Sequence, residues 1–165
     1  MAIRNIEAIN RKAVQVAKER DNAKRLSHER VDALITTILK SYNDVKDVVD
    51  TISALKSKGL GNLYEKFEKN MTCGIRYIDQ YGALVMRCGD CVIRVQTKDK
   101  CSSPINVAWN AHGLGEGYNI YTGMDDYTYR CVLNENRRGY LHLLEQMSAK
   151  LQPFCDAFFE FIETI

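Results

Sequence analysis

The sequence predicts an α+β protein in which an antiparallel sheet lies between helical segments at the two ends of the chain. Residues 1–58 contain neither glycine nor proline, a composition that permits helix throughout. Residues 71–133 change to strand-like alternation with glycines at turns, and residues 135–165 return to helical spacing. Segregated helices and antiparallel strands are typical of the α+β class. We therefore expect a single domain spanning residues 1–165.

Composition narrows the class of protein. A chain of 165 residues, 45% of them hydrophobic and only two of them proline, can fold around one core. It contains no apolar run approaching the roughly 18 residues that cross a bilayer, and its basic start lacks an apolar secretory core. We therefore expect a cytoplasmic protein without a membrane partner. Six cysteines are few for a disulfide scaffold, so they should stay thiols or bind metal.

The first helix is predicted over about residues 3–25, with Ser27 as the N-cap of the next helix. Its buried stripe is thin because two of its members are alanines, so this helix should be held less firmly than the second. The alternative is one continuous helix through Ser27, which would then project beyond the domain. The stripe consists of residues at helical spacing: Ile3, Ile6, Ile9, Ala13, Val16 and Ala17.

The second helix carries the clearest pattern in the chain. Its apolar residues recur in steps of four and three, the seam repeat of a helix that packs along another helix. Gly59 and Gly61 are expected to end it, and a short amphipathic helix follows. The seam residues are Val31, Ile35, Ile38, Tyr42, Val45, Val49 and Ile52.

Residues 83–96 predict a β-hairpin with a two-residue turn at Gly89 and Asp90. One register places six apolar residues on one face, which should be the core face, and leaves a face of mixed polarity on the other side. In that register Cys88 faces Cys91, Met86 faces Ile93, and Leu84 faces Val95.

Further strands should bring the sheet to about five or six. The candidates are Gly74–Ile78, Ile105–Trp109, Tyr118–Thr122 and Tyr127–Leu133, the last two joined by a hairpin loop at residues 123–126. A long closing helix then begins near residue 135. Pro153 lies off its seam and should kink or divide it, because the proline ring excludes the carbonyl four residues back. This seam contains Tyr140, Leu144, Met147, Leu151, Phe154, Phe158, Phe161 and Ile165.

The two long helices offer more apolar surface than one sheet face readily covers. We expect them to pack together within the chain, with the remaining surface forming a homodimer or a partner site.

Cys88 and Cys91 form a CxxC on the hairpin turn, the spacing of one half of a zinc ribbon. A tetrahedral site needs further ligands, and the chain contains no second CxxC, CxxH or HxxxH. Buried cysteines that complete the core face of the hairpin are the better explanation of the pair. We therefore predict no metal and no cofactor. The alternative is a zinc site at Cys88 and Cys91 with Cys73 or Cys101.

No other motif predicts catalysis. The glycine-rich segment 112–117 has GxGxG spacing and is followed by a strand-like segment, so it lacks the helix of a phosphate-binding fingerprint. A cysteine–histidine pair such as Cys131 with His142 has no local signature. We predict no catalytic residues and a protein that is not an enzyme. The glycine-rich loop should instead be able to move beside Trp109, the only tryptophan.

The first helix also carries a line of basic residues. Arg4, Arg11, Lys18 and Arg25 are each seven residues apart, which places them opposite the apolar stripe. Residues 1–30 hold eight Lys/Arg and four Asp/Glu, a net charge of +4. Such a line suits an acidic surface or phosphates. The simpler interpretation is an ordinary solvated face, and the segment contains no aromatic residue for stacking on single strands.

These observations favour a non-enzymatic protein-binding module, an adaptor or inhibitor-type regulatory protein of the kind that mobile elements and viruses direct at larger machines. Tryptophan is a common interface anchor. The expected partner-binding residues are therefore Arg4, Arg11, Lys18, Arg25, Trp109 and His112. The alternative is a nucleic-acid-binding protein that uses the basic face of the first helix.

Overall fold

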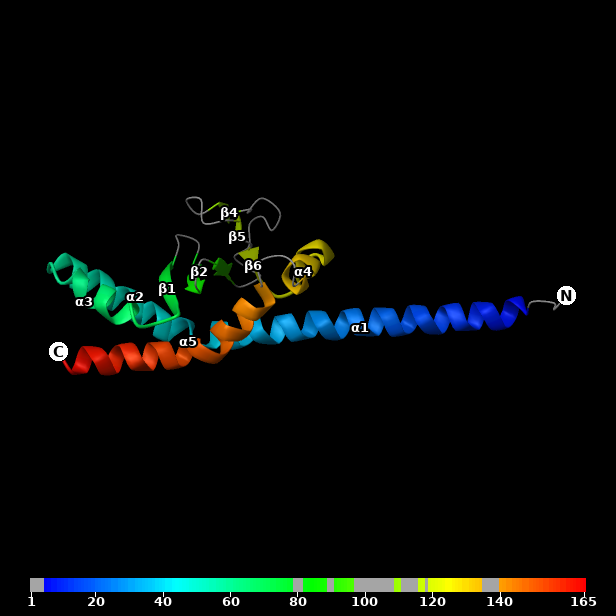
Figure 1. Ribbon diagram of the computed structural model, residues 1–165, viewed down its shortest axis with the longest axis horizontal. Helices are drawn as coiled ribbons and strands as arrows, with labels where there is room; N and C mark the ends of the chain where they lie inside the picture. Colours follow the sequence, from blue (N-terminus) through cyan, green and yellow to red (C-terminus); the bar gives the residue numbers. More distant parts are fainter. Residues whose placement is uncertain are drawn as a thin grey trace. The chain divides into compact units, whose positions relative to one another are not determined.

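The computed structural model of the protein has the helices and strands of an α+β protein, which confirms the predicted class (Figure 1). It describes residues 5–78, 82–88, 91–96, 109–110, 116–117, 119–134 and 140–165. By its contacts the chain divides into residues 1–30 and 31–165, and each unit is described by itself. The elements are α1 (Ile6–Lys40), α2 (Tyr42–Ser57), α3 (Gly61–Glu68), β1 (Cys73–Ile78), β2 (Leu84–Cys88), β3 (Cys91–Val95), β4 (Trp109–Asn110), β5 (Glu116–Gly117), β6 (Asn119–Ile120), α4 (Asp126–Leu133) and α5 (Tyr140–Glu163).

The first two helices separate at Ser41 and not at Ser27, so the predicted N-cap was wrong. Around Ser27 the helix continues because no glycine or proline interrupts it and Arg25 pairs with Glu29 one turn later, at 2.9 Å. At Ser41 the backbone N–H bonds to the carbonyl of Ile38, three residues back, at 3.1 Å. This tighter turn ends α1 and starts α2 without a side-chain cap.

The seam predicted for the second helix forms the core despite this break. Val31, Ile35, Ile38 and Val45 are fully buried, and Ile52 is nearly so. Beyond the break Val48 is also fully buried, whereas Tyr42 and Val49 are only partly covered. Apolar spacing therefore identified the buried face, although the helix boundary lay elsewhere.

The main sheet has the strand order β1-β2-β3-β6. The hairpin register is the predicted one, with Cys88 paired to Cys91, Met86 to Ile93 and Leu84 to Val95. The strands β1, β2 and β3 are antiparallel, and the two-residue β6 joins β3 in parallel. Within the described ranges the antiparallel sheet therefore has three strands, fewer than the five or six predicted.

The second face of the hairpin is also covered. Val85 and Ala83 are fully buried, and Arg94 and Gln96 are nearly so. The sequence assigned only the apolar face to the core. Polar residues at alternate positions were therefore a poor guide to solvent exposure in β3.

The predicted strand Tyr127–Leu133 is the helix α4, so the hairpin at residues 123–126 was also wrong. Tyrosine, threonine and valine favour strands, but Asp125 caps a helix at this point. Its carboxylate accepts hydrogen bonds from the backbone N–H of Thr128 at 2.7 Å and from the Thr128 hydroxyl at 2.9 Å. Burial follows helical spacing, at Thr128, Tyr129, Cys131 and Val132. Capping and packing here outweigh strand propensity.

Replacing Asp125 with alanine should lower the free energy of unfolding by about 1 kcal/mol, because the N–H of Thr128 loses its acceptor. Urea unfolding followed by circular dichroism measures the change. Asp125→Ser is the matched control, since serine can still accept from Thr128 and should retain most of the stability. Equal losses in both variants would show that the cap contributes little.

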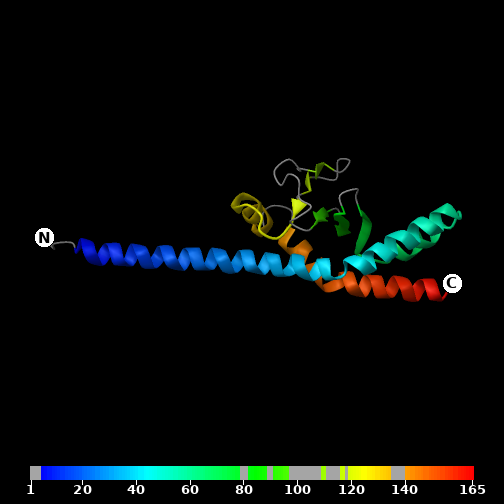
Figure 2. The ribbon, with the colours of Figure 1, turned by 180° about the vertical axis from the view of Figure 1, so that it is seen from behind.

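The closing helix α5 is continuous through Pro153. Figures 1 and 2 both show its axis changing direction part-way along, so the predicted kink is confirmed and a division is not. Its buried side follows the predicted seam from Leu144 to Phe158, and Leu143 and Cys155 are buried with it. The end of the predicted seam is different, because Ile165 is 64% exposed.

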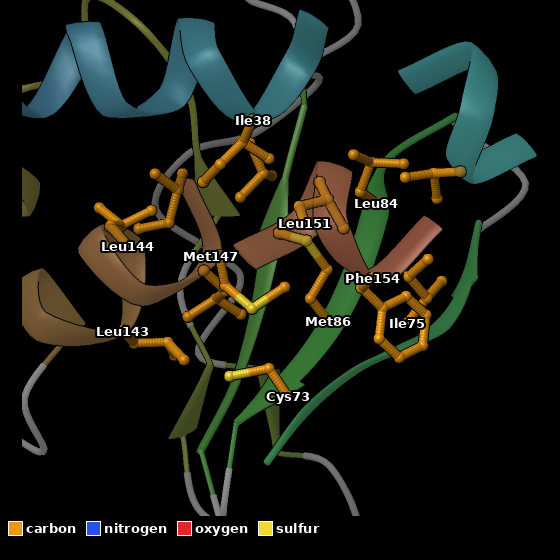
Figure 3. Packing of buried hydrophobic residues seen from close by; sticks show 14 of the residues in the cluster. Ile38, Cys73, Ile75, Leu84, Met86, Leu143, Leu144, Met147, Leu151 and Phe154 are labelled. Atoms are coloured by element: carbon orange, nitrogen blue, oxygen red, sulfur yellow. The ribbon is translucent and has the colours of Figure 1, made fainter. Parts of the chain in front are cut away.

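The core of residues 31–165 fills the space between helices and sheet. Both α2 and α5 contact β1, and they contact each other. Figure 3 shows Ile38, Leu144 and Leu151 from the helices packed near Leu84 and Met86 from the sheet, all within one hydrophobic cluster. Among the described helices, none is both long and apolar enough to cross a membrane.

Polar contacts attach the helices at the edge of this core. The hydroxyl of Tyr64 in α3 donates to the carbonyl of Ile75 at 2.9 Å, and Arg87 donates to the carboxylate of Glu68 at 2.7 Å. Across the other helices, the amide of Gln152 donates to Asp44 at 2.7 Å.

Candidate partner-binding helix

The first 25 residues of α1 form the most exposed helical segment, and we call residues 6–30 the exposed helix. It starts at a cap, since the side chain of Asn5 accepts from the N–H of Ala8 at 3.0 Å. A hydrogen bond between side chains four residues apart, from Gln15 to Glu19 at 3.0 Å, adds local support. Local hydrogen bonds within the segment therefore favour the helix.

The apolar stripe predicted to be buried on this helix is exposed. Ile6 is 67% exposed, Ile9 54% and Val16 55%. The residues seven positions after Ala13 and Ala17 are Arg20 and Lys24, so charges interrupt the stripe where the core face would have continued. This signal was present in the sequence. Val14 and Leu26 are also more than half exposed.

The structure describes three of the four residues of the predicted basic line. Arg11, Lys18 and Arg25 are all exposed, and Arg4 lies outside the described residues. Arg25 donates to Glu29 at 2.9 Å and to Asn22 at 2.6 Å, which partly neutralises its charge. Exposed pairs of this kind contribute little to stability. The line of basic side chains therefore remains available to an external partner.

The other predicted contact region is only partly described. Trp109 belongs to β4, whose backbone pairs antiparallel with β5, Trp109 opposite Gly117. The side chain of Trp109 and the whole of His112 lie outside the described residues. Their role in partner binding stays a prediction.

The strand register brings three of the six cysteines into one row. Cys73 pairs with Cys88, and Cys88 pairs with Cys91. Neighbouring strands are about 4.8 Å apart, so the outer two backbones lie about 10 Å apart, whereas two sulfurs on one zinc ion are at most about 4.6 Å apart. Three cysteines in a row across neighbouring strands are therefore poorly placed to form a tetrahedral zinc site. Cys101 and the side chains of Cys88 and Cys91 lie outside the description.

Among the residues whose side chains are described, no group of three or more His, Cys, Asp or Glu is placed to hold a metal ion. The metal-free prediction and the zinc alternative both stay open for the hairpin cysteines. Of the pair considered for nucleophilic chemistry, Cys131 is buried in α4, and exposed His142 lies 3.3 Å from the amide nitrogen of Gln146.

Comparison with known proteins adds no relative: no protein-family model matches the chain, and no curated protein or solved structure is significantly similar to it. The functional proposals below therefore depend on the surfaces of this chain alone.

Proposed function

We propose that the protein is a non-enzymatic protein-binding module, an adaptor or inhibitor, and that the exposed helix is its main contact surface. The observation that carries the proposal is the exposure of five large apolar side chains on one helical segment: Ile6, Ile9, Val14, Val16 and Leu26. An ordinary solvated face would not need branched apolar residues. Each contributes about 1.5–3 kcal/mol when fully buried by a partner.

The two sides of the exposed helix indicate the chemistry of that partner. Ile6, Ile9 and Val16 suit an apolar groove of the kind that receives amphipathic helices. Arg11 and Lys18, on the opposite side, suit an acidic rim, which speeds encounter and makes it sensitive to salt. The proposed partner is therefore a protein with an acidic surface around an apolar groove. Trp109 and His112 are proposed as a second contact region.

Reversing the basic line should weaken partner capture strongly at low salt. The variant Arg11→Glu, Lys18→Glu, Arg25→Glu keeps a helical sequence but turns attraction into repulsion. Affinity capture from cells, with nuclease present and quantified by mass spectrometry at two salt concentrations, measures the effect. The control Lys46→Glu, Lys58→Glu, Lys66→Glu makes the same charge change at exposed residues outside the exposed helix and should retain capture.

The apolar side is tested separately by Ile9→Gln with Val16→Gln, which should weaken capture with little dependence on salt. If neither this variant nor the charge reversal alters capture, the exposed helix is not the contact surface.

The same basic line supports a second candidate function, binding to nucleic acid. Phosphate contacts release counterions, so affinity for a duplex should fall steeply with salt, and losing three contacts should reduce the logarithmic slope by about three. Capture that disappears with nuclease would favour this function over a protein partner.

A further inference from the structure

A cavity of about 290 Å³ lies between the start of β1 and the middle of α5. Met71, Cys73 and Gly74 line it from the strand side, and Met147, Leu151 and Phe154 line it from the helix. Figure 3 shows how close the side chains of Cys73, Met147, Leu151 and Phe154 lie in this region. All of these residues belong to the unit 31–165, so the cavity is independent of the exposed helix.

The residues that line the cavity determine its chemistry. Pro153 lines it from α5, and its missing N–H leaves the helix ladder incomplete at that point. Gly74 contributes backbone to the opposite wall, where the side chain of Glu68 occupies the space beside it. Cys73 and the two methionines supply sulfur atoms, which are polarisable and adapt to ligands of varied shape. The wall is therefore apolar and adaptable.

A basic residue, Lys150, is among the residues that line this largely apolar cavity. Lys150 lines the cavity and is exposed, so its ammonium can reach the mouth. In the described part of the chain no ion pair involves Lys150. Glu68 lies near this wall, since its Oε1 would lie 2.8 Å from a Cβ at residue 74, and Arg87 already engages its carboxylate. An anionic head group would therefore meet a positive charge at the mouth.

We propose that this cavity binds a medium-chain carboxylic acid, with the alkyl chain among the sulfur-containing side chains and the carboxylate beside Lys150. An apolar cavity of about 150 Å³ accommodates benzene, so a cavity about twice as large accommodates roughly a dozen non-hydrogen atoms. Decanoate has about that size. An apolar pocket with one polar group that fixes orientation is the usual form of a small-molecule site.

The five methionines provide the assay. In protein labelled with ¹³C at the methionine methyl groups, decanoate should shift the signals of Met71 and Met147, which line the cavity, and leave Met124, which does not, in place. Single Met→Leu variants assign the signals. Decanol, which has the same chain without the charge, should shift the same two signals at higher concentration.

Two substitutions separate the chain-binding and charge-binding parts of the proposal. Ala157→Phe places a ring in the cavity. It should abolish the shifts of the methionine signals with both decanoate and decanol. Lys150→Gln should weaken decanoate about fivefold, the scale of an exposed ion pair, and leave decanol unchanged. Lys150→Arg and Lys46→Gln, a substitution at a residue that does not line the cavity, should both bind decanoate as the unmodified protein does.

The proposal is overturned if decanoate leaves the methyl signals of Met71 and Met147 in place, or if Lys150→Gln binds decanoate as tightly as the unmodified protein. It is also overturned if these two signals shift with protein concentration alone, because the cavity would then receive a second copy of the chain.

Discussion

Replacing Phe158 with alanine should lower the free energy of unfolding by about 3–5 kcal/mol, the usual cost of emptying a buried aromatic site. Phe158 is fully buried. Its ring packs edge-on against Tyr64 and Phe67 of α3, with centroids 5.9 and 5.5 Å apart, so its removal loosens α3 as well as α5. Urea unfolding at neutral pH measures the change.

The neighbouring Phe159 provides a matched control. It is only partly buried, and its ring contacts that of Phe158 at 5.7 Å. Phe159→Ala should therefore cost less than half as much. If Phe158→Ala leaves too little folded protein to measure, Phe158→Leu, which keeps much of the volume, should cost about 1–1.5 kcal/mol. Equal losses at positions 158 and 159 would contradict the described packing.

Replacing Tyr129 with phenylalanine should cost about 1.5–3 kcal/mol, because the lost hydroxyl bonds to a charged group. It donates to the carboxylate of Asp32 at 2.6 Å and accepts from the N–H of Gly123 at 2.9 Å. The bond to Asp32 joins α1 to α4 across 97 residues of sequence. Tyr127→Phe, at a side chain 58% exposed, should change stability by less than about 0.5 kcal/mol.

The contribution of Tyr129 should also depend on pH. Burial, together with the hydrogen bond to Asp32 and its negative charge, raises the pKa of Tyr129 to about 12, above its ordinary value of 10.0. The unfolded chain therefore loses this proton first. The stabilisation is complete below about pH 10 and is lost as the pH rises toward 12.

The stability difference between the unmodified protein and Tyr129→Phe should accordingly narrow between pH 9 and pH 12, as urea unfolding at several pH values would show. Burial also raises the pKa of Tyr64, but that residue is present in both proteins and cancels in the difference. A stability difference between the two proteins that stays constant over this pH range would contradict the raised pKa of Tyr129.

The parts of the fold that sequence predicted are those in which one physical requirement dominates. The hairpin register followed from alternation, because a slip of one residue would move Met86 and Ile93 off the core face. The seam at Val31 and Ile35 followed from helical spacing. The strand prediction at Tyr127–Leu133 failed because the N-cap at Asp125 outweighs the intrinsic strand preference of this segment.

The candidate sites show a different limit. The basic line at Arg11 and Lys18 could be found by counting in sevens. The charges of Arg20 and Lys24 also interrupt the opposite apolar stripe in the sequence, but how far Ile6 is exposed required the structure. The cavity could not be predicted at all. Cys73 and Lys150 are far apart in sequence, and neither has a local signature that would associate it with the other.

The bond between Asp44 and Gln152 spans 108 residues and joins α2 to α5. During synthesis at about 5–20 residues per second, the second of these residues is added roughly 5–20 s after the first. Until then the apolar faces of α2 and the hairpin have no α5 to cover them. The nascent chain therefore exposes the surface around Val45 and Met86 to chaperones and to aggregation for seconds, and its core can close only once α5 has left the ribosome.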